Sequence, residues 1–214
     1  RVPIVIHDKT LERTTDGHGL VSEFTLSKLK KLDAGSWFSP EFEGESIPTL
    51  EEILIQIRGK ISVNIEIKPE SFESNDPADA IEKQICRMVE KFEMIESVLI
   101  SSFEHSFFQR IKLWHRKKNN NTSIKIAPLQ EKSFSHENVL KLCKSTEAYS
   151  LHLDERFLTP SIVEFLNANH LRTIAYTINN EKRIEHLVKW GVTGLITDEP
   201  ELAWKVLRKF NCNE

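Results

Sequence analysis

Residues 61–68 read Ile-Ser-Val-Asn-Ile-Glu-Ile-Lys, an alternation of aliphatic and polar residues. Side chains of a strand alternate between two faces, so Asn64, Glu66 and Lys68 share one face while aliphatic residues share the other. A short apolar run of this kind, bounded by charged or turn residues, is typical of a strand covered on both faces of a parallel sheet. The stretch therefore predicts a central parallel strand that ends in an acid and a base.

Similar runs recur along the chain and alternate with longer amphipathic segments. The β-rich runs are Val2–Ile6, Ile61–Ile67, Val98–Ser101, Ser123–Ala127, Ala148–Leu153, Arg172–Thr177 and Gly194–Thr197. The segments that predict helices are Pro77–Phe92, His105–Lys117, Phe134–Lys144, Pro160–Asn169, Glu181–Trp190 and Glu201–Phe210. Strand–helix–strand repetition implies parallel pairing through right-handed crossovers. We therefore predict an α/β protein. The six units from Ile61 onward favour a TIM (β/α)8-barrel whose first two strands are missing from this chain, although the periodicity also fits a doubly wound sheet.

Residues at the ends of two helical segments support these boundaries. Thr159, which precedes a proline, and Asn180, which precedes a glutamate, are typical N-cap residues. Gly191 follows a tryptophan and is typical of the position just after a helix.

Residues 9–60 depart from the strand–helix alternation. They contain a turn-rich segment at residues 13–19 and one short helical pattern, Leu50–Arg58. No low-complexity linker divides the chain. We therefore expect one barrel domain over residues 1–214, with residues 9–60 as a small insertion.

The composition narrows the class of protein. The 214 residues are 39% hydrophobic and 29% charged, with a formal net charge of −3. No apolar run approaches the roughly 20 residues of a membrane-spanning helix. Aliphatic residues recur along the whole chain, which argues against disorder. The balanced charge favours neither nucleic acid nor an anionic membrane as a partner.

The three cysteines indicate whether the compartment of the protein is reducing or oxidising. Cys86, Cys143 and Cys212 are widely spaced and form no CxxC pair, which argues against a zinc site or a disulfide framework. Such thiols are typical of a reducing compartment, so we expect a cytoplasmic protein. The sequence does not set the oligomeric state.

Reactive groups of a β/α barrel lie at the C-terminal ends of its strands. Glu66 and Lys68 lie together at such an end, and two interpretations stay open. They form a mutual salt bridge, or the carboxylate binds a hard cation while the ammonium takes an anionic oxygen. His7 directly follows the first β-rich run and is either a general acid or base or a histidine bonded to backbone. His152, within a strand run, is a minor candidate for the barrel mouth.

Eight short motifs follow one another from the start of the chain nearly to its end. They are residues 3–8 (Pro-Ile-Val-Ile-His-Asp), 11–19 (Leu-Glu-Arg-Thr-Thr-Asp-Gly-His-Gly), 32–35 (Leu-Asp-Ala-Gly), 47–52 (Ile-Pro-Thr-Leu-Glu-Glu), 64–68 (Asn-Ile-Glu-Ile-Lys), 101–103 (Ser-Ser-Phe), 176–179 (Tyr-Thr-Ile-Asn) and 191–200 (Gly-Val-Thr-Gly-Leu-Ile-Thr-Asp-Glu-Pro). This ordered series resembles the glycerophosphodiester phosphodiesterase family.

The resemblance implies a TIM barrel with a small insertion that hydrolyses glycerophosphodiesters to glycerol 3-phosphate and an alcohol. It also implies a divalent cation, Mg²⁺ or Ca²⁺, as cofactor. His7 matches the second of two catalytic histidines of the family, Glu66 a metal-binding carboxylate, and Lys68 a basic catalytic residue beside the phosphate. Tyr176 takes the place of an aromatic residue, usually tryptophan, near the glycerol end of the substrate.

Two motifs of the family are absent from the sequence. They are His-Arg-Gly, which carries the other catalytic histidine, and Glu-x-Asp, which supplies two metal ligands. The chain begins at Arg1 rather than Met, so we expect these motifs upstream of it and expect the chain on its own to be inactive. Two alternative functions remain: a non-catalytic barrel module that binds a phosphorylated ligand or a protein partner, and a lipid-directed phosphodiesterase of the same fold.

Overall fold

The computed structural model describes residues 2–117, 123–133 and 135–211. Cys212, and Phe134 at the start of a predicted helix, lie outside these residues. The chain folds into two compact units. The N-terminal unit consists of Arg1–Ser62 and Glu70–Met94, and the sheet unit of Val63–Pro69 and Ile95–Glu214. A single domain over the whole chain stays a prediction.

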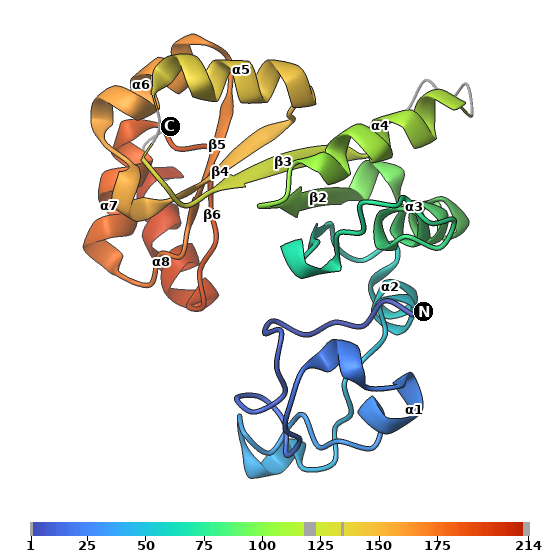
Figure 1. Cartoon of the computed structure of the whole chain (residues 1–214). Coiled ribbons are helices and arrows are strands. Elements are labelled where there is room, and N and C mark those ends of the chain that lie inside the picture. Colours follow the sequence, from blue (N-terminus) through green and yellow to red (C-terminus); the bar gives the residue numbers. More distant parts are fainter. Residues whose placement is uncertain (1, 118–122, 134, 212–214) are drawn as a thin grey trace. The chain divides into compact units, whose positions relative to one another are not determined.

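The sheet unit contains one sheet of six parallel strands, which lie side by side in the order of the chain (Figure 1). They are β1 (Val63–Glu66), β2 (Val98–Ser102), β3 (Lys125–Gln130), β4 (Ser150–Asp154), β5 (Arg172–Tyr176) and β6 (Gly194–Leu195). A doubly wound sheet reverses its strand order at a switch point, whereas a barrel adds each strand beside the preceding one. The strand order is therefore that of a half-barrel and confirms the predicted α/β fold.

Helices of the sheet unit follow the strands, as the alternation predicts. They are α4 (Ser106–Lys117), α5 (His136–Thr146), α6 (Pro160–Ala168), α7 (Glu181–Trp190) and α8 (Pro200–Asn211), with short 3-10 turns η4 (Ile95–Ser97) and η5 (Glu155–Phe157). The predicted boundaries are confirmed: the side chains of Thr159 and Asn180 accept hydrogen bonds from the backbone N–H groups of Ile162 and Arg183. Gly191 ends α7 in the left-handed region, at φ 85°. In the part of the chain that the structure describes, no helix is both long and apolar enough to cross a membrane.

The core of the sheet unit lies between the strands and these helices. Leu151 and Leu153 of β4 belong to a buried cluster that also contains residues of α5, α6, α7 and α8. Because side chains alternate along a strand, Ser150, His152 and Asp154 point to the opposite, inner face, and they are buried as well. The inner face of the half-barrel therefore carries buried polar groups.

The N-terminal unit is mostly irregular. Its helices are α1 (Leu26–Leu29), α2 (Leu50–Ile57) and α3 (Ile81–Lys91), with 3-10 turns η1 (Val21–Glu23) and η2 (Pro40–Phe42). A third 3-10 turn, η3 (Pro69–Ser71), lies where the chain passes from the sheet unit to the N-terminal unit. The prediction of a strand at Val2–Ile6 is wrong, because this run forms one isolated bridge, from Ile4 to Thr49. Thr49 is the N-cap of α2, so its chain turns into a helix and the ladder ends.

The Asp33 carboxylate holds the segment of residues 33–44 in the N-terminal unit. Asp33 accepts hydrogen bonds from the backbone N–H groups of Gly35 at 2.8 Å, Ser36 at 2.9 Å and Gly44 at 3.1 Å. A Cβ on Gly35 would lie 1.9 Å from the backbone carbonyl oxygen of Phe42, so only glycine fits this close approach. A small buried cluster of Leu11, Leu29 and Ile47 completes the unit.

Candidate active site

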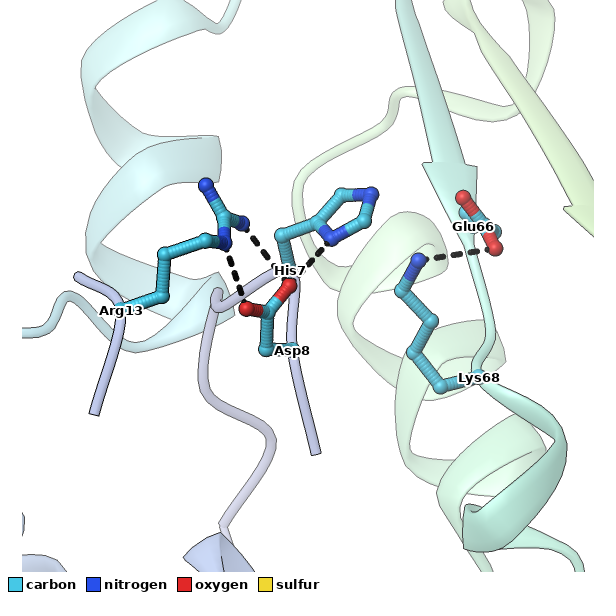
Figure 2. Close-up of polar contacts among 5 residues, drawn as sticks. All are labelled: His7, Asp8, Arg13, Glu66 and Lys68. Carbon is cyan, nitrogen blue, oxygen red and sulfur yellow. Dashed lines mark hydrogen bonds and ion pairs between the residues drawn. The ribbon is translucent and has the colours of Figure 1, made fainter. Parts of the chain in front are cut away.

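Glu66 and Lys68 lie at the C-terminal end of β1, as predicted. Glu66 is the last residue of the strand and lies in register with Ser101 of β2. Lys68 Nζ donates to Glu66 Oε1 at 3.0 Å, and the two side chains keep 25% and 29% of their surface exposed (Figure 2). The salt bridge is therefore formed, and both groups still face solvent from which a ligand can reach them.

Tyr176 lies at the corresponding end of β5. Its hydroxyl donates to the backbone carbonyl oxygen of Gln130, the last residue of β3, at 3.0 Å. The edge of its ring meets the ring of Phe103, which directly follows β2, with 6.2 Å between the centroids. The ends of β2, β3 and β5 thus meet through one aromatic pair and one hydrogen bond.

The carboxylate of Glu66 is one of the groups that change the pKa of Tyr176. Burial raises the pKa of the Tyr176 phenol well above its usual value, and the carboxylates of Asp154, Glu131 and Glu66 raise this pKa further. The phenol therefore stays a neutral donor at working pH. The structure brings Glu66, Lys68 and Tyr176 to the same, C-terminal edge of the sheet.

An ion pair at the end of β4 escaped the sequence analysis. Arg156 Nε donates to both carboxylate oxygens of Asp154, at 2.9 and 3.0 Å. The Arg156 guanidinium lowers the pKa of Asp154, which is only 8% exposed. The available signal was the position of Asp154, directly after the β-rich run Ala148–Leu153. Phe103 was missed as a site residue for a similar reason, since it was noted only as part of a motif.

His152 does not lie at an opening. Its side chain is buried on the inner face of β4, and burial lowers its pKa to about 4. Among the described residues its Nδ1 has no hydrogen-bond partner. His152 is thus a neutral interior residue at working pH.

His7 belongs to the N-terminal unit, where it forms a chain of polar contacts. Its Nδ1 lies 2.7 Å from Asp8 Oδ1 (Figure 2). Asp8 in turn accepts from Arg13 Nε at 2.6 Å and from Arg13 Nη2 at 2.8 Å. Neither of the two open interpretations of His7 described this partner, which is a side chain and not backbone. The resemblance implies that His7 acts on the same phosphate as Glu66 and Lys68, and this stays a prediction.

The described residues do not by themselves make a cation site. A hard divalent cation takes about six oxygen ligands. In the described part of the chain no group of three or more His, Cys, Asp or Glu side chains is placed to hold a metal ion. The carboxylate of Glu66, which the resemblance implies as a metal ligand, is already paired with Lys68.

The chain is similar to proteins of one family along nearly its whole length. A glycerophosphodiester phosphodiesterase of Caldanaerobacter subterraneus is 35% identical over 211 residues, which cover 96% of this chain and 80% of that protein. A glycerophosphodiester phosphodiesterase of Bacillus subtilis is 31% identical, over 97% of this chain and 72% of its own. Among solved structures, a phosphodiesterase of Oleispira antarctica in complex with the product sn-glycerol-3-phosphate superposes with a TM-score of 0.74. It is 25% identical, and the match covers 97% of this chain and 80% of that one.

The family model described as the glycerophosphoryl diester phosphodiesterase family matches residues 1–202. The half-barrel, the ordered motifs and these relatives agree, and the chain belongs to the glycerophosphodiester phosphodiesterase family.

Proposed function

We propose that the protein hydrolyses glycerophosphodiesters to glycerol 3-phosphate and an alcohol, with His7 as an acid/base catalyst. The observation that carries this proposal is the Glu66–Lys68 pair, partly exposed at the C-terminal end of β1. Active sites of β/α barrels lie at this edge. The relatives named glycerophosphodiester phosphodiesterases, and the glycerol 3-phosphate bound to the Oleispira antarctica enzyme, support the substrate class.

The residues at this edge suit an anionic phosphodiester. The Lys68 ammonium is a compact charge that takes a non-bridging phosphate oxygen. The Phe103–Tyr176 pair offers an apolar surface for the carbon atoms of the glycerol moiety. His7 exchanges a proton with a reacting oxygen, which requires an imidazole nitrogen within hydrogen-bond reach of it.

We propose a divalent cation, Mg²⁺ or Ca²⁺, as the cofactor, because the resemblance to the family implies one. When bound, such an ion neutralises the charge of phosphate oxygens. Glu66 would be one of its ligands, and the other described residues do not complete the set. We therefore assign no step of the reaction to the cation from this chain alone.

The proposal is tested with glycerophosphocholine in the natural full-length protein, with glycerol 3-phosphate as the measured product. His7→Ala is expected to lower kcat by roughly 10²–10⁴-fold, the usual contribution of a general acid or base. His18→Ala is the matched control, since His18 is an exposed histidine of the same unit and is expected to leave kcat unchanged. Near-normal turnover of His7→Ala would overturn the role of His7. Binding of glycerol 3-phosphate without any turnover would favour the non-catalytic alternative.

The cation requirement is tested on the chain itself. Calorimetric titration with Mg²⁺ and with Ca²⁺ is expected to show no tight binding, because one carboxylate supplies too few oxygen ligands. Tight binding to the chain, lost in Glu66→Gln, would show that its residues complete a cation site after all.

A further inference from the structure

Asp8 is the centre of the polar chain in the N-terminal unit. Its side chain is 26% exposed, compared with 73% for His7 and 54% for Arg13. Both carboxylate oxygens accept from Arg13, and Oδ1 also faces His7 Nδ1 (Figure 2). Asp8 thus connects the two cationic or basic groups on either side of it.

The charge state of Asp8 decides which ring nitrogen of His7 carries the hydrogen. The Arg13 guanidinium, and after it the His7 ring, hold the pKa of Asp8 well below its usual range. Asp8 is therefore ionised at any working pH. An ionised carboxylate can only accept hydrogen bonds, so the ring nitrogen that faces it, Nδ1, must carry the hydrogen. In neutral His7 the other nitrogen, Nε2, is then left with its lone pair.

Arg13 is itself held in place. Its guanidinium lies 5.9 Å from the centre of the Trp37 ring. The Trp37 indole N–H donates to the backbone carbonyl oxygen of Ala34 at 2.9 Å, which fixes the ring. The bidentate geometry of Arg13 on Asp8 and its contact with the Trp37 ring both depend on a planar guanidinium, which a lysine lacks.

We propose that Asp8 and Arg13 are positioning residues for His7, which hold its ring in the tautomer that leaves Nε2 free to exchange the proton of the reaction. The inference rests on the proposed function of His7. It adds that Asp8 acts through His7 and does not itself touch the substrate.

The first test reads the tautomer directly and needs no activity. Nitrogen chemical shifts of the neutral His7 ring, measured by NMR in the chain itself, are expected to show Nδ1 protonated and Nε2 unprotonated. In Asp8→Ala this preference is expected to be lost, while the ring of His18 and the thermal unfolding curve stay the same. A wild-type His7 that carries its proton on Nε2, or an Asp8→Ala variant with an unchanged His7 tautomer, would overturn the proposal.

The second test separates positioning from a structural role, in the natural full-length protein. Asp8→Ala is expected to lower kcat roughly 100-fold, the size of effect that misplacing a reacting group produces, with little change in KM. Arg13→Lys, which keeps the charge but loses the two-point contact, is expected to lower kcat less. Added to His7→Ala, Asp8→Ala is expected to cause no further loss, because Asp8 acts only through His7.

The outcomes distinguish the two proposals. If His7→Ala keeps normal turnover, the catalytic role of His7 fails and the positioning role fails with it. If His7→Ala is inactive but Asp8→Ala keeps the wild-type kcat, the positioning role fails alone. A loss in Asp8→Ala that recurs in full on top of His7→Ala would indicate a structural role and would also overturn the inference.

Discussion

The core of the sheet unit and the loops of the N-terminal unit are held by different contacts. In the sheet unit, side chains such as Leu151 and Leu153 are fully buried in an apolar cluster that joins strands to helices. The N-terminal unit also buries apolar side chains, among them Leu54 and Val89, and in its loops carboxylates accept hydrogen bonds from backbone N–H groups. Asp33 does so in one loop and Glu12 in another, where it accepts from Gly19 N at 2.7 Å.

This difference determines which charge state each unit needs. The carboxylates of the N-terminal unit stabilise it while they are ionised. The sheet unit instead encloses His152, which must stay neutral because burial penalises its charged form. Lowering the pH therefore acts on His152 of the sheet unit in a higher pH range than on Glu12 of the N-terminal unit.

The largest effect is expected from the apolar cluster. Leu153→Ala removes a fully buried side chain of β4 and is expected to lower the free energy of unfolding by about 2–5 kcal/mol, through lost burial and a cavity. Leu113→Ala on α4 is the matched control, because Leu113 is 53% exposed, and its change should stay within about 0.5 kcal/mol. Urea unfolding followed by circular dichroism measures both. Equal losses in the two variants would show that burial in the apolar cluster does not determine the stability of the sheet unit.

The next effect concerns His152. Its pKa is about 4 in the folded chain and about 6.5 in the unfolded one. Between these values the unfolded chain takes up a proton that the folded chain does not, so stability falls as the pH falls from 6.5 to 4. The full loss is about 3 kcal/mol. Urea unfolding at several pH values measures it, and in His152→Gln the dependence in this range should shrink. An unchanged pH dependence in the variant would assign the loss to other groups.

The smallest and most local effect is expected in the N-terminal unit. The backbone N–H of Gly19 is the main cause that lowers the pKa of Glu12 from 4.5 to about 2. A group with a lowered folded pKa stabilises the fold above its unfolded pKa, and this contribution is lost as the pH falls from about 4.5 towards 2. Amide hydrogen exchange should therefore show loss of protection at Gly19 in this range, while amides of β4 and β5 stay protected.

Glu12→Gln provides the matched variant for this measurement. It is expected to expose the Gly19 amide already at neutral pH, because a neutral amide oxygen is a weaker acceptor than a carboxylate. Protection at Gly19 that does not depend on pH or on this substitution would remove Glu12 from the group of stabilising carboxylates.

Much of the sheet unit could be predicted from local patterns. The helix that begins after Asn180 and ends at Gly191 was predicted with its bounds, because an N-cap and a left-handed glycine act within a few residues. Glu66, Lys68 and Tyr176 were predicted at strand ends, and the strand bounds confirm these positions. Val2–Ile6 was predicted wrongly, because its β-rich composition does not show that its partner turns into α2 after Thr49.

Alternation of apolar residues, helix caps and ordered motifs therefore establish the α/β class and the family, since each acts over a short stretch of chain. The order of the strands in the sheet was decided by the tertiary structure. The Phe103–Tyr176 contact, the burial of His152 and the hydrogen bond of Arg13 to Asp8 depend on folding. They join side chains from separate strands or loops, or set how far a side chain lies from water. Such contacts depend on distances in space, which residue spacing along the chain does not encode.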